Sequence, residues 1–157
     1  MKLNLKLKNF IDLNDFEKNL ILQYRNKKQI AKFMKNSHID FNEHLNFLSN
    51  LKNDLTKKYF LVYDDNEAIG VIDFTHITPQ TCDFGLYGIK KNVGDILMNE
   101  VKTYAFNVLK VQILKAYVFK NNTKALNLYT KHNFYIYDEN SEFYFIKLDN
   151  PNWNIIS

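Results

Sequence analysis

The chain has 157 residues, so we expect a single domain spanning residues 1–157. An apolar fraction of 46%, with 13 Phe and 10 Tyr, is sufficient for an aromatic core, and no apolar run is long enough to cross a membrane. The net charge is +4, and because the Lys residues are scattered and Arg25 is the single Arg, a nucleic-acid partner is disfavoured. The single cysteine, Cys82, cannot form an internal disulfide, so we expect a cytoplasmic protein.

The first third of the chain is patterned as one strand followed by two helices. Alternating apolar residues over Leu3–Phe10 predict the strand. Asp12–Tyr24 is predicted as a helix, and one of its faces carries Phe16, Leu20 and Tyr24. Asp40, three residues before Glu43, forms an N-cap pattern that predicts the start of a second helix. We expect the inward face of that helix to carry Phe41, Leu45, Leu48 and Leu51.

Strands and helices alternate through the rest of the chain. A β-meander is expected over Tyr59–Tyr63, Ala68–Ile77 and Cys82–Tyr87. A basic loop from Gly88 to Gly94 leads into a helix over Asp95–Asn107, whose apolar stripe comprises Leu97, Val101, Tyr104 and Val108. A strand, a short helix and a hairpin are then expected over Val111–Phe119, Thr123–Lys131, Phe134–Tyr137 and Phe143–Leu148. This order predicts an α/β (α+β) fold with one parallel crossover.

The element order resembles the GNAT acetyltransferase fold over nearly the whole chain. The resemblance implies a central, mixed but mostly antiparallel twisted sheet of about seven strands, flanked by four helices and splayed into a V between strands 4 and 5. It also implies acetyl-CoA as co-substrate, held by a Q/R-x-x-G-x-G/A loop between a strand and a helix. Backbone N–H groups of such a loop, together with a helix N-terminus, stabilise an anion such as a pyrophosphate.

The segment Leu86–Leu97 is similar to this loop but departs from it at two positions. Gly94 fills the second glycine position, whereas Asn92 and Ile89 stand at the first glycine and Q/R positions. Asn tolerates a positive φ, so the loop can keep its path. The neighbouring Lys90 and Lys91 can replace the missing positive charge. An ordinary strand-to-helix connection is the alternative interpretation.

A second motif matches the family more closely. Asn122, Ala125 and Tyr129 fit the closing pattern N-x-x-A-x-x-x-Y-x-x-x-G-F, in which only the glycine differs and is replaced by Asn133, a residue suited to a left-handed C-cap. By this resemblance, Asn122 contacts the pantetheine arm and the Tyr129 hydroxyl points at the CoA sulfur; a core tyrosine is the alternative. The residues assigned to acetyl-CoA are Tyr87, Gly88, Ile89, Lys90, Lys91, Asn92, Val93, Gly94, Asp95, Asn122, Ala125, Tyr129 and Lys131.

The chemistry implied by the resemblance needs few protein groups. An amine attacks the thioester, a backbone N–H near Leu86 or Tyr87 stabilises the developing oxyanion, and Tyr129 protonates the leaving thiolate. Asp73, in an apolar strand, can serve as a base or a water holder, or can bond to a neighbouring hydroxyl. We do not expect Cys82 to act as a nucleophile, because no cation lies beside it in the sequence. Asp95 suits the helix N-terminus, but it would crowd a phosphate if it pointed inward.

Several segments resemble the PseH subfamily of these acetyltransferases, among them Gln23–Asn26, His44–Phe47, Lys58–Leu61 and Gly70–Thr75. That resemblance implies acetylation of the 4-amino group of a UDP-linked 4-amino-4,6-dideoxy sugar, a step in pseudaminic acid biosynthesis for flagellin glycosylation. It maps the acceptor site onto Arg25, His44, Thr75, His76 and Tyr87. Alternatively, Arg25 can interact favourably with the dipole at the C-terminus of the first helix or pair with Glu17 or Asp12, and His44 can be a surface residue.

Three other functions remain open at this stage. The chain can acetylate a protein N-terminus or a polyamine, although the net charge of +4 disfavours a polyamine. It can be an acyl-CoA sensor without chemistry, or a nucleic-acid binder. No His, Cys or carboxylate spacing predicts a metal site. We expect no nucleic-acid or membrane partner, and either a monomer or a homodimer.

Overall fold

Apolar residues that alternate along seven segments build the sheet of this protein. The structure is a computed structural model and describes residues 3–34 and 38–153. The strands are β1 (Leu5–Asn9), β2 (Lys58–Asp64), β3 (Glu67–Thr75), β4 (Thr81–Gly88), β5 (Ile113–Phe119), β6 (Tyr135–Glu139) and β7 (Phe143–Asp149). The helices are α1 (Asp15–Arg25), α2 (Lys28–Ala31), α3 (Phe41–Leu51), α4 (Gly94–Thr103) and α5 (Thr123–Lys131), with a 3₁₀ turn at Phe10–Asp12 and a π-helical turn at Tyr104–Val108.

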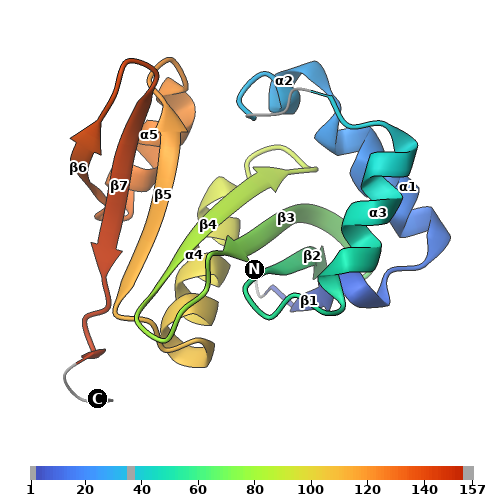
Figure 1. Cartoon of the computed structure of the whole chain (residues 1–157), viewed down its shortest axis with the longest axis horizontal. Helices are drawn as coiled ribbons and strands as arrows, with labels where there is room; N and C mark the ends of the chain where they lie inside the picture. The colour runs from blue at the N-terminus through green and yellow to red at the C-terminus, as the bar shows by residue number, and fades with distance from the viewer. Residues whose placement is uncertain (1–2, 35–37, 154–157) are drawn as a thin grey trace.

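All seven strands lie in one sheet, in the order β1-β2-β3-β4-β5-β7-β6. Every neighbouring pair is antiparallel except β4 and β5, which run parallel and pair only from Thr81↔Ile113 to Asp83↔Lys115. Beyond Asp83, β4 continues to Gly88 without β5 beside it, so the two strands open into a V (Figure 1). The predicted mixed sheet, its parallel crossover and its splay are confirmed.

Helices cover the two faces of the sheet. On one face, α1 and α3 pack Ile21, Leu48 and Leu51 against Leu61 and Val71. On the other face, α4 and α5 pack against alternate residues of the same strands, in a core that includes Phe60, Ile72, Phe74, Leu97, Met98, Val101 and Tyr129. Full burial of such a side chain stabilises the fold by about 1.5–3 kcal/mol. No helix within the described ranges is long and apolar enough to span a membrane.

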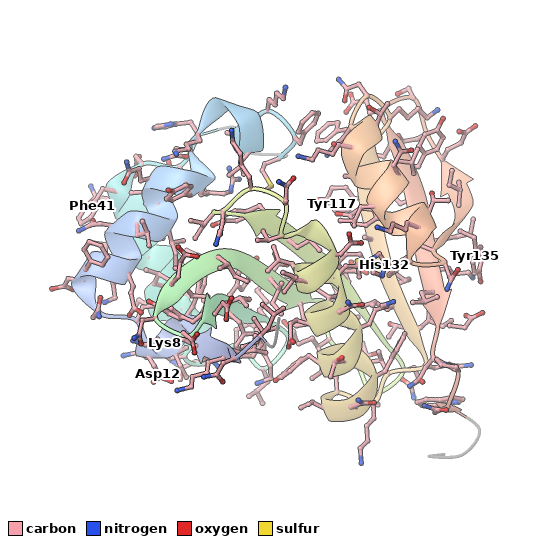
Figure 2. All side chains as sticks on the ribbon, turned by 180° about the vertical axis from the view of Figure 1, so that it is seen from behind. Lys8, Asp12, Phe41, Tyr117, His132 and Tyr135 are labelled. Carbon is pink, nitrogen blue, oxygen red and sulfur yellow. The ribbon has the colours of Figure 1, made fainter. Side chains whose placement is uncertain are left out.

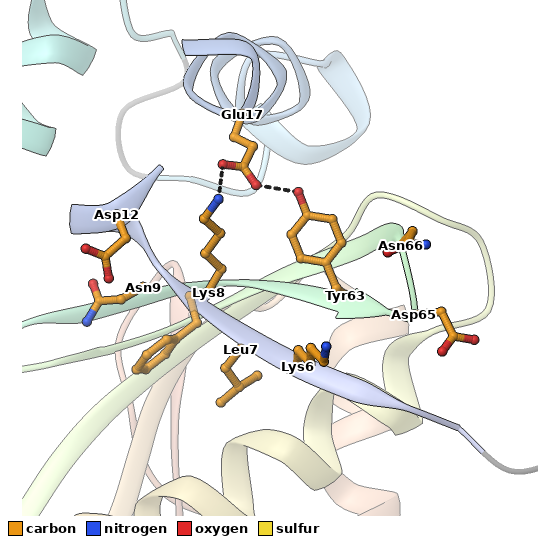
Figure 3. A pocket seen from close by; sticks show the side chains of 10 residues that line it. Lys6, Leu7, Lys8, Asn9, Asp12, Glu17, Tyr63, Asp65 and Asn66 are labelled. Atoms are coloured by element: carbon orange, nitrogen blue, oxygen red, sulfur yellow. Dashed lines mark hydrogen bonds and ion pairs between the residues drawn. The ribbon is translucent and has the colours of Figure 1, made fainter. Parts of the chain in front are cut away.

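The predicted apolar face of the first helix is wrong. The helix begins at Asp15 rather than Asp12, because Asn14 is the N-cap and forms a capping box with Glu17. The inward positions are therefore Glu17 and Ile21, and Phe16 is 75% exposed. Lys8 Nζ and the Tyr63 hydroxyl both donate to the buried Glu17 carboxylate (Figure 3). Although burial raises the pKa of Glu17, these hydrogen bonds outweigh it and lower the pKa below its usual value.

The inward face of α3 also differs from the prediction. Leu48 and Leu51 are buried as expected, but Phe41 is 51% exposed and points away from the body of the protein (Figure 2), and Leu45 is exposed as well. The buried face instead runs through His44, which is 4% exposed. The prediction assumed that apolar residues are buried and polar ones exposed. In α3 the His44 imidazole is buried with a hydrogen-bond partner, whereas Phe41 and Leu45 are exposed.

The helix expected over Asp95–Asn107 changes geometry before its end. Its α-helical part stops at Thr103, and the Leu109 N–H bonds the Tyr104 carbonyl across a wider π-helical turn. The Tyr104 ring stacks on Phe74 at a centroid distance of 5.0 Å. The wider turn rotates Val108 out of the expected apolar stripe and into solvent.

Candidate active site

A cavity of about 560 Å³ lies on the α1/α3 side of the sheet, where β4 and β5 separate. It collects eight of the residues singled out from the sequence, which come from five elements, the turn after β3 and the N-cap position of α5: Arg25, His44, Asp73, Thr75, His76, Tyr87, Asn122 and Tyr129. The first and the last of them, Arg25 and Tyr129, are more than 100 residues apart in the sequence, so folding of the sheet brings the set together. Tyr87 pairs with Val71 near the end of β4 and lines the cavity.

Asp73 lies at the centre of the strand face that borders the cavity. Its register partners are Tyr59 on β2 and Gly85 on β4, so these three residues share one face. A Cβ at Gly85 would lie 2.7 Å from Asp73 Oδ2, so only glycine leaves room for the carboxylate. Burial, with a smaller contribution from the Asp83 carboxylate, raises the pKa of Asp73 to about 7. A carboxyl group with this pKa can accept and release a proton near neutral pH.

Tyr129 enters the cavity from α5 and is 8% exposed. Its ring packs edge-on against Phe84 at a centroid distance of 5.4 Å, which fixes the direction of the hydroxyl. Burial and, to a smaller extent, the Asp73 charge raise the pKa of Tyr129 well above its usual value. The phenol therefore keeps its proton until a strong base such as a thiolate is formed beside it.

Arg25 contributes positive charge to the cavity. The Arg25 guanidinium stands at the end of α1 near the phenol groups of Tyr59, Tyr87 and Tyr117, and burial lowers its pKa. Glu17, one of the acids considered as its partner, is instead bonded to Lys8 and Tyr63. Arg25 has its planar donor group in the cavity, where it can bind an anionic ligand.

His44 is a buried cavity residue and not a surface residue. Its Nε2 lies 2.8 Å from the Lys18 carbonyl oxygen, and since a carbonyl only accepts, Nε2 carries the hydrogen. Burial is the main cause that lowers the pKa of His44. The ring is therefore neutral near pH 7, and its Nδ1 can accept a hydrogen bond.

The rim of the cavity is formed where β3 ends. Thr75 pairs with Asp83, and the next residue, His76, has a positive φ of 49°. His76 Nδ1 lies 2.9 Å from Asp83 Oδ2, and this hydrogen bond stabilises the left-handed turn. Asp83 was not identified from the sequence, because its place beside Asp73 depends on strand register.

The loop from Gly88 to Gly94 has the geometry expected for an anion site. Asn92 adopts a φ of 61°, which confirms the positive φ predicted for the residue that replaces glycine. Helix α4 follows, and no side chain caps its first amides at the N-cap residue Val93. A Cβ at Gly94 would lie 3.2 Å from Leu128 Cδ2, so this glycine permits close packing of α4 on α5. Exposed Lys91 adds positive charge to the loop.

Other polar residues of the predicted cofactor set bond elsewhere. Asp95 accepts from Lys131 Nζ at 2.9 Å and interacts with His132 Nε2 at 2.8 Å, so its carboxylate faces α5. Lys90, in the loop after β4, pairs with Glu67 at the start of β3. Ile89 packs against the α1/α3 core, whereas the Leu86 side chain packs into the core on the opposite face. The backbone of Leu86 and Tyr87 lies beyond the part of β4 that pairs with β5, where an N–H group can serve as the predicted oxyanion donor.

Helix α5 has the caps that its motif predicts. The Asn122 side chain accepts a hydrogen bond from the Ala125 amide, and the same residue lines the cavity. Asn133 has a φ of 72°. The Phe134 and Asn133 amides bond the carbonyls of Tyr129 and Thr130, the paired bonds of a Schellman C-cap. These caps fix both ends of the short helix that presents Tyr129.

Cys82 is fully buried on β4, and burial raises the pKa of its thiol to about 12. A thiol with this pKa is not a nucleophile near neutral pH, in line with the prediction. Among the residues that the structure describes, no group of three or more His, Cys, Asp or Glu side chains is placed to hold a metal ion.

A second, more open hollow of about 650 Å³ lies along β1. Its lining includes Lys6, Lys8, Glu17 and Tyr63, and three of these belong to the hydrogen-bonded network described above (Figure 3). It contains none of the residues predicted for a site. The residues singled out from the sequence therefore gather at the cavity in the V and not at this hollow.

Comparison with known proteins agrees with this fold. The sequence profile of the Acetyltransferase (GNAT) family matches residues 23–134. A Campylobacter jejuni protein named Acetyltransferase PseH is 57% identical over 146 residues, which cover 92% of this chain and 93% of that protein. A second Campylobacter jejuni Acetyltransferase PseH is 56% identical over the same length.

Solved structures give the same result. The crystal structure of Campylobacter jejuni N-acetyltransferase PseH in complex with acetyl coenzyme A matches with a TM-score of 0.82 and 52% identity, over 93% of this chain and 99% of that one. The Vibrio cholerae spermidine N-acetyltransferase in complex with CoA and spermine has a TM-score of 0.83 but 18% identity, so it supports the fold alone. By its sequence profile, its relatives and its splayed sheet, this chain belongs to the acetyltransferase (GNAT) family.

Proposed function

We propose that this protein is an acetyl-CoA-dependent N-acetyltransferase that acetylates the 4-amino group of a UDP-linked 4-amino-4,6-dideoxy sugar, a step of pseudaminic acid biosynthesis. The observation that carries the proposal is one cavity with acid–base groups, Asp73 and Tyr129, and an anion-binding group, Arg25. The similarity to PseH acetyltransferases, one of them crystallised with acetyl coenzyme A, supports the co-substrate and the pathway.

The loop and the start of α4 would hold the pyrophosphate of acetyl-CoA. The first amides of α4 have no side-chain cap, and the positive φ of Asn92 turns the loop backbone as the missing glycine would. These amides and the positive end of the helix stabilise a dianionic group. Asn122, at the start of α5, lines the same cavity as Tyr129 and fits the pantetheine arm.

The cavity residues then divide the acid–base work. Asp73 takes a proton from the acceptor ammonium, and the freed amine attacks the thioester carbon. A backbone N–H of the unpaired edge of β4, near Leu86 or Tyr87, stabilises the oxyanion. As the C–S bond breaks, Tyr129 protonates the thiolate and recovers a proton from the amide nitrogen that has formed. Positioning of the two reactants provides much of the acceleration.

Charge distribution in the cavity favours a nucleotide sugar over a polyamine. An acceptor with a diphosphate at one end and an amine at the other complements Arg25 and Asp73. A polyamine would place a cationic group against Arg25, which costs binding energy. We expect either a monomer or a homodimer. We assign the reaction to the cytoplasm, where we expect both proposed substrates to be present.

Product analysis tests this function directly. The protein is incubated with acetyl-CoA and the UDP-linked 4-amino-4,6-dideoxy sugar, and the product is examined by tandem mass spectrometry. We expect one added acetyl group, located on N4 of the sugar. The matched sugar with a hydroxyl group at C4 should remain unmodified. An acetyl group on a different atom, or no transfer, would contradict the proposal.

Acetyl-CoA is expected to stabilise the fold. At about 100 times its Kd, a ligand that binds only the folded state adds about 2.7 kcal/mol, which shifts the thermal midpoint of a domain of this size by roughly 5–10 °C. Asn92→Val should lose this shift, because a β-branched residue disfavours the positive φ of the loop. Lys110→Val, at a φ of 56° after the π-helical turn, is the matched control and should keep the shift.

Activity is expected to fall on the acid side of neutrality. Because the pKa of Asp73 is raised to about 7, the carboxyl group is protonated below pH 7 and cannot accept the ammonium proton. We therefore expect kcat/KM to decrease about tenfold per pH unit below an inflection near pH 7. Asp73→Asn should remove this inflection, whereas Asp65→Asn, in the β2–β3 turn, should retain it. An unchanged profile in Asp73→Asn would exclude Asp73 as the base.

A further inference from the structure

Two carboxylates, and not one, face the acid–base end of the cavity. Asp73 on β3 and Asp83 on β4 both line it. Asp83 pairs in register with Thr75, and Asp73 with Gly85, so the two acids are diagonal neighbours on the same face of an antiparallel pair. The Asp83 charge contributes to the raised pKa of Asp73, as expected for two like charges that interact.

The oxygen atoms of this pair have acceptor capacity left over. His76 Nδ1 donates a hydrogen bond to Asp83 Oδ2 at 2.9 Å. Across the described residues, 3–34 and 38–153, no other group hydrogen-bonds to Asp83 and none to Asp73, so both Asp73 oxygens and Asp83 Oδ1 remain available. Gly85 between the two acids has no side chain to fill the space over Asp73. Three carboxylate oxygens around an open space match the three N–H donors of a primary ammonium.

Other titratable groups around Asp73 do not neutralise the pair. Those that interact with Asp73 electrostatically are the phenols Tyr59, Tyr87, Tyr117 and Tyr129, which are neutral near pH 7. Lys57 lines the cavity and Lys115 is the register partner of Asp83, yet neither Lys lies within 4.0 Å of these carboxylates in the described chain. The negative charges of Asp73 and Asp83 repel each other, so binding of a cation between them is favourable.

We propose that Asp83, together with Asp73, forms the binding subsite for the acceptor amine in its ammonium form, with His76 orienting Asp83. This inference rests on the proposed function and extends it, because it explains how the site selects the charged nitrogen before proton transfer. Asp73 then accepts one proton from the bound ammonium and the nitrogen lone pair becomes the nucleophile. The product amide is neutral, has lost its affinity for the acid pair and can leave.

Binding by calorimetry of two matched ligands tests the subsite. The ligands are the UDP-linked 4-amino-4,6-dideoxy sugar and the same sugar with a hydroxyl group at C4. At pH 7 we expect the wild-type protein to bind the amine about 10- to 100-fold more tightly. Raising the pH above the pKa of the sugar amine should remove this preference. Asp83→Asn should reduce the preference severalfold or more at pH 7, with an unchanged Kd for the hydroxyl sugar, which also reports that the variant is folded.

Asp65→Asn removes the same charge from a remote turn and should keep the full preference. If the wild-type protein binds both sugars equally, the ammonium subsite is wrong while the nucleotide-sugar assignment stands. An unchanged preference in Asp83→Asn would remove Asp83 from the subsite. If the wild-type protein binds neither sugar, the proposed function fails, and the inference fails with it.

Discussion

Replacing Tyr129 by Phe is expected to lower kcat roughly 100- to 10,000-fold, the range typical for loss of a positioned acid. The affinity for acetyl-CoA should change little, because the ring keeps its edge-on contact with Phe84 and its place on α5. Burial keeps the hydroxyl protonated, so the oxygen removed is the group that donates to the thiolate. Steady-state turnover and the Kd of acetyl-CoA, measured on the same preparation, test both statements.

Tyr104→Phe provides the matched control for this experiment. The Tyr104 ring packs against Phe60 and Phe74 in the core on the far face of the sheet, so its variant loses the same atom outside the cavity. We expect it to retain turnover. Wild-type turnover in Tyr129→Phe would mean that water or another group protonates the thiolate, and Tyr129 would then be only a core residue.

Arg25→Lys is expected to reduce kcat/KM for the UDP-sugar by about 10- to 150-fold, which corresponds to the loss of about 1.5–3 kcal/mol from one charge-assisted contact. Lys retains the charge but cannot donate from a planar fork to two oxygens of a diphosphate. The Kd of acetyl-CoA should not change, because Arg25 lies in the acceptor cavity at the end of α1 and not in the loop before α4.

The thermal midpoint of the same variant separates binding from stability. If the Arg25 charge interacts only with the C-terminal end of the α1 dipole, the variant loses stability and keeps its kcat/KM. Lys27→Arg, two residues beyond Arg25, tests whether a guanidinium at the end of α1 affects the kinetics when it lies outside the cavity. A lower midpoint with an unchanged kcat/KM would contradict the assignment of Arg25 to the diphosphate.

Local signals in the sequence were sufficient to predict the backbone features of the site. Asn92 and Asn133 both replace a family glycine, and both adopt the positive φ that such positions require. The cap of α5 by Asn122 followed from the same motif. These features depend on residues within one turn of each other, so a sequence pattern contains the information that determines them.

Predictions that depended on distant contacts were less successful. The inward face of α1 was assigned to Phe16, but the capping box at Asn14 shifts the start of the helix, and Glu17 is buried because Lys8 and Tyr63 bond to it. His44 is buried for a similar reason, since the Lys18 carbonyl accepts from its ring. Apolar periodicity cannot identify a buried polar residue whose partner lies on another element.

For the same reason, the sequence identified Asp73 but not Asp83, the second residue of the acid pair. Asp73 was conspicuous in an apolar strand, whereas Asp83 gave no signal until the register of β3 and β4 placed it on the same face. Tyr59 and Tyr117 were also missed, because their approach to Arg25 depends on how far β5 diverges from β4. Alternation along each strand predicts which residues share a face, but not which strands face one cavity.

A competition experiment tests the central claim most directly. Wild-type protein is incubated with acetyl-CoA and equal concentrations of the UDP-linked 4-amino-4,6-dideoxy sugar, spermidine and a peptide with a free N-terminus, and initial products are quantified by mass spectrometry. The charge pattern set by Arg25, Asp73 and Asp83 predicts that the sugar alone gains one acetyl group at early times. Preferential acetylation of spermidine or of the peptide would contradict the assignment of the cavity to a nucleotide sugar.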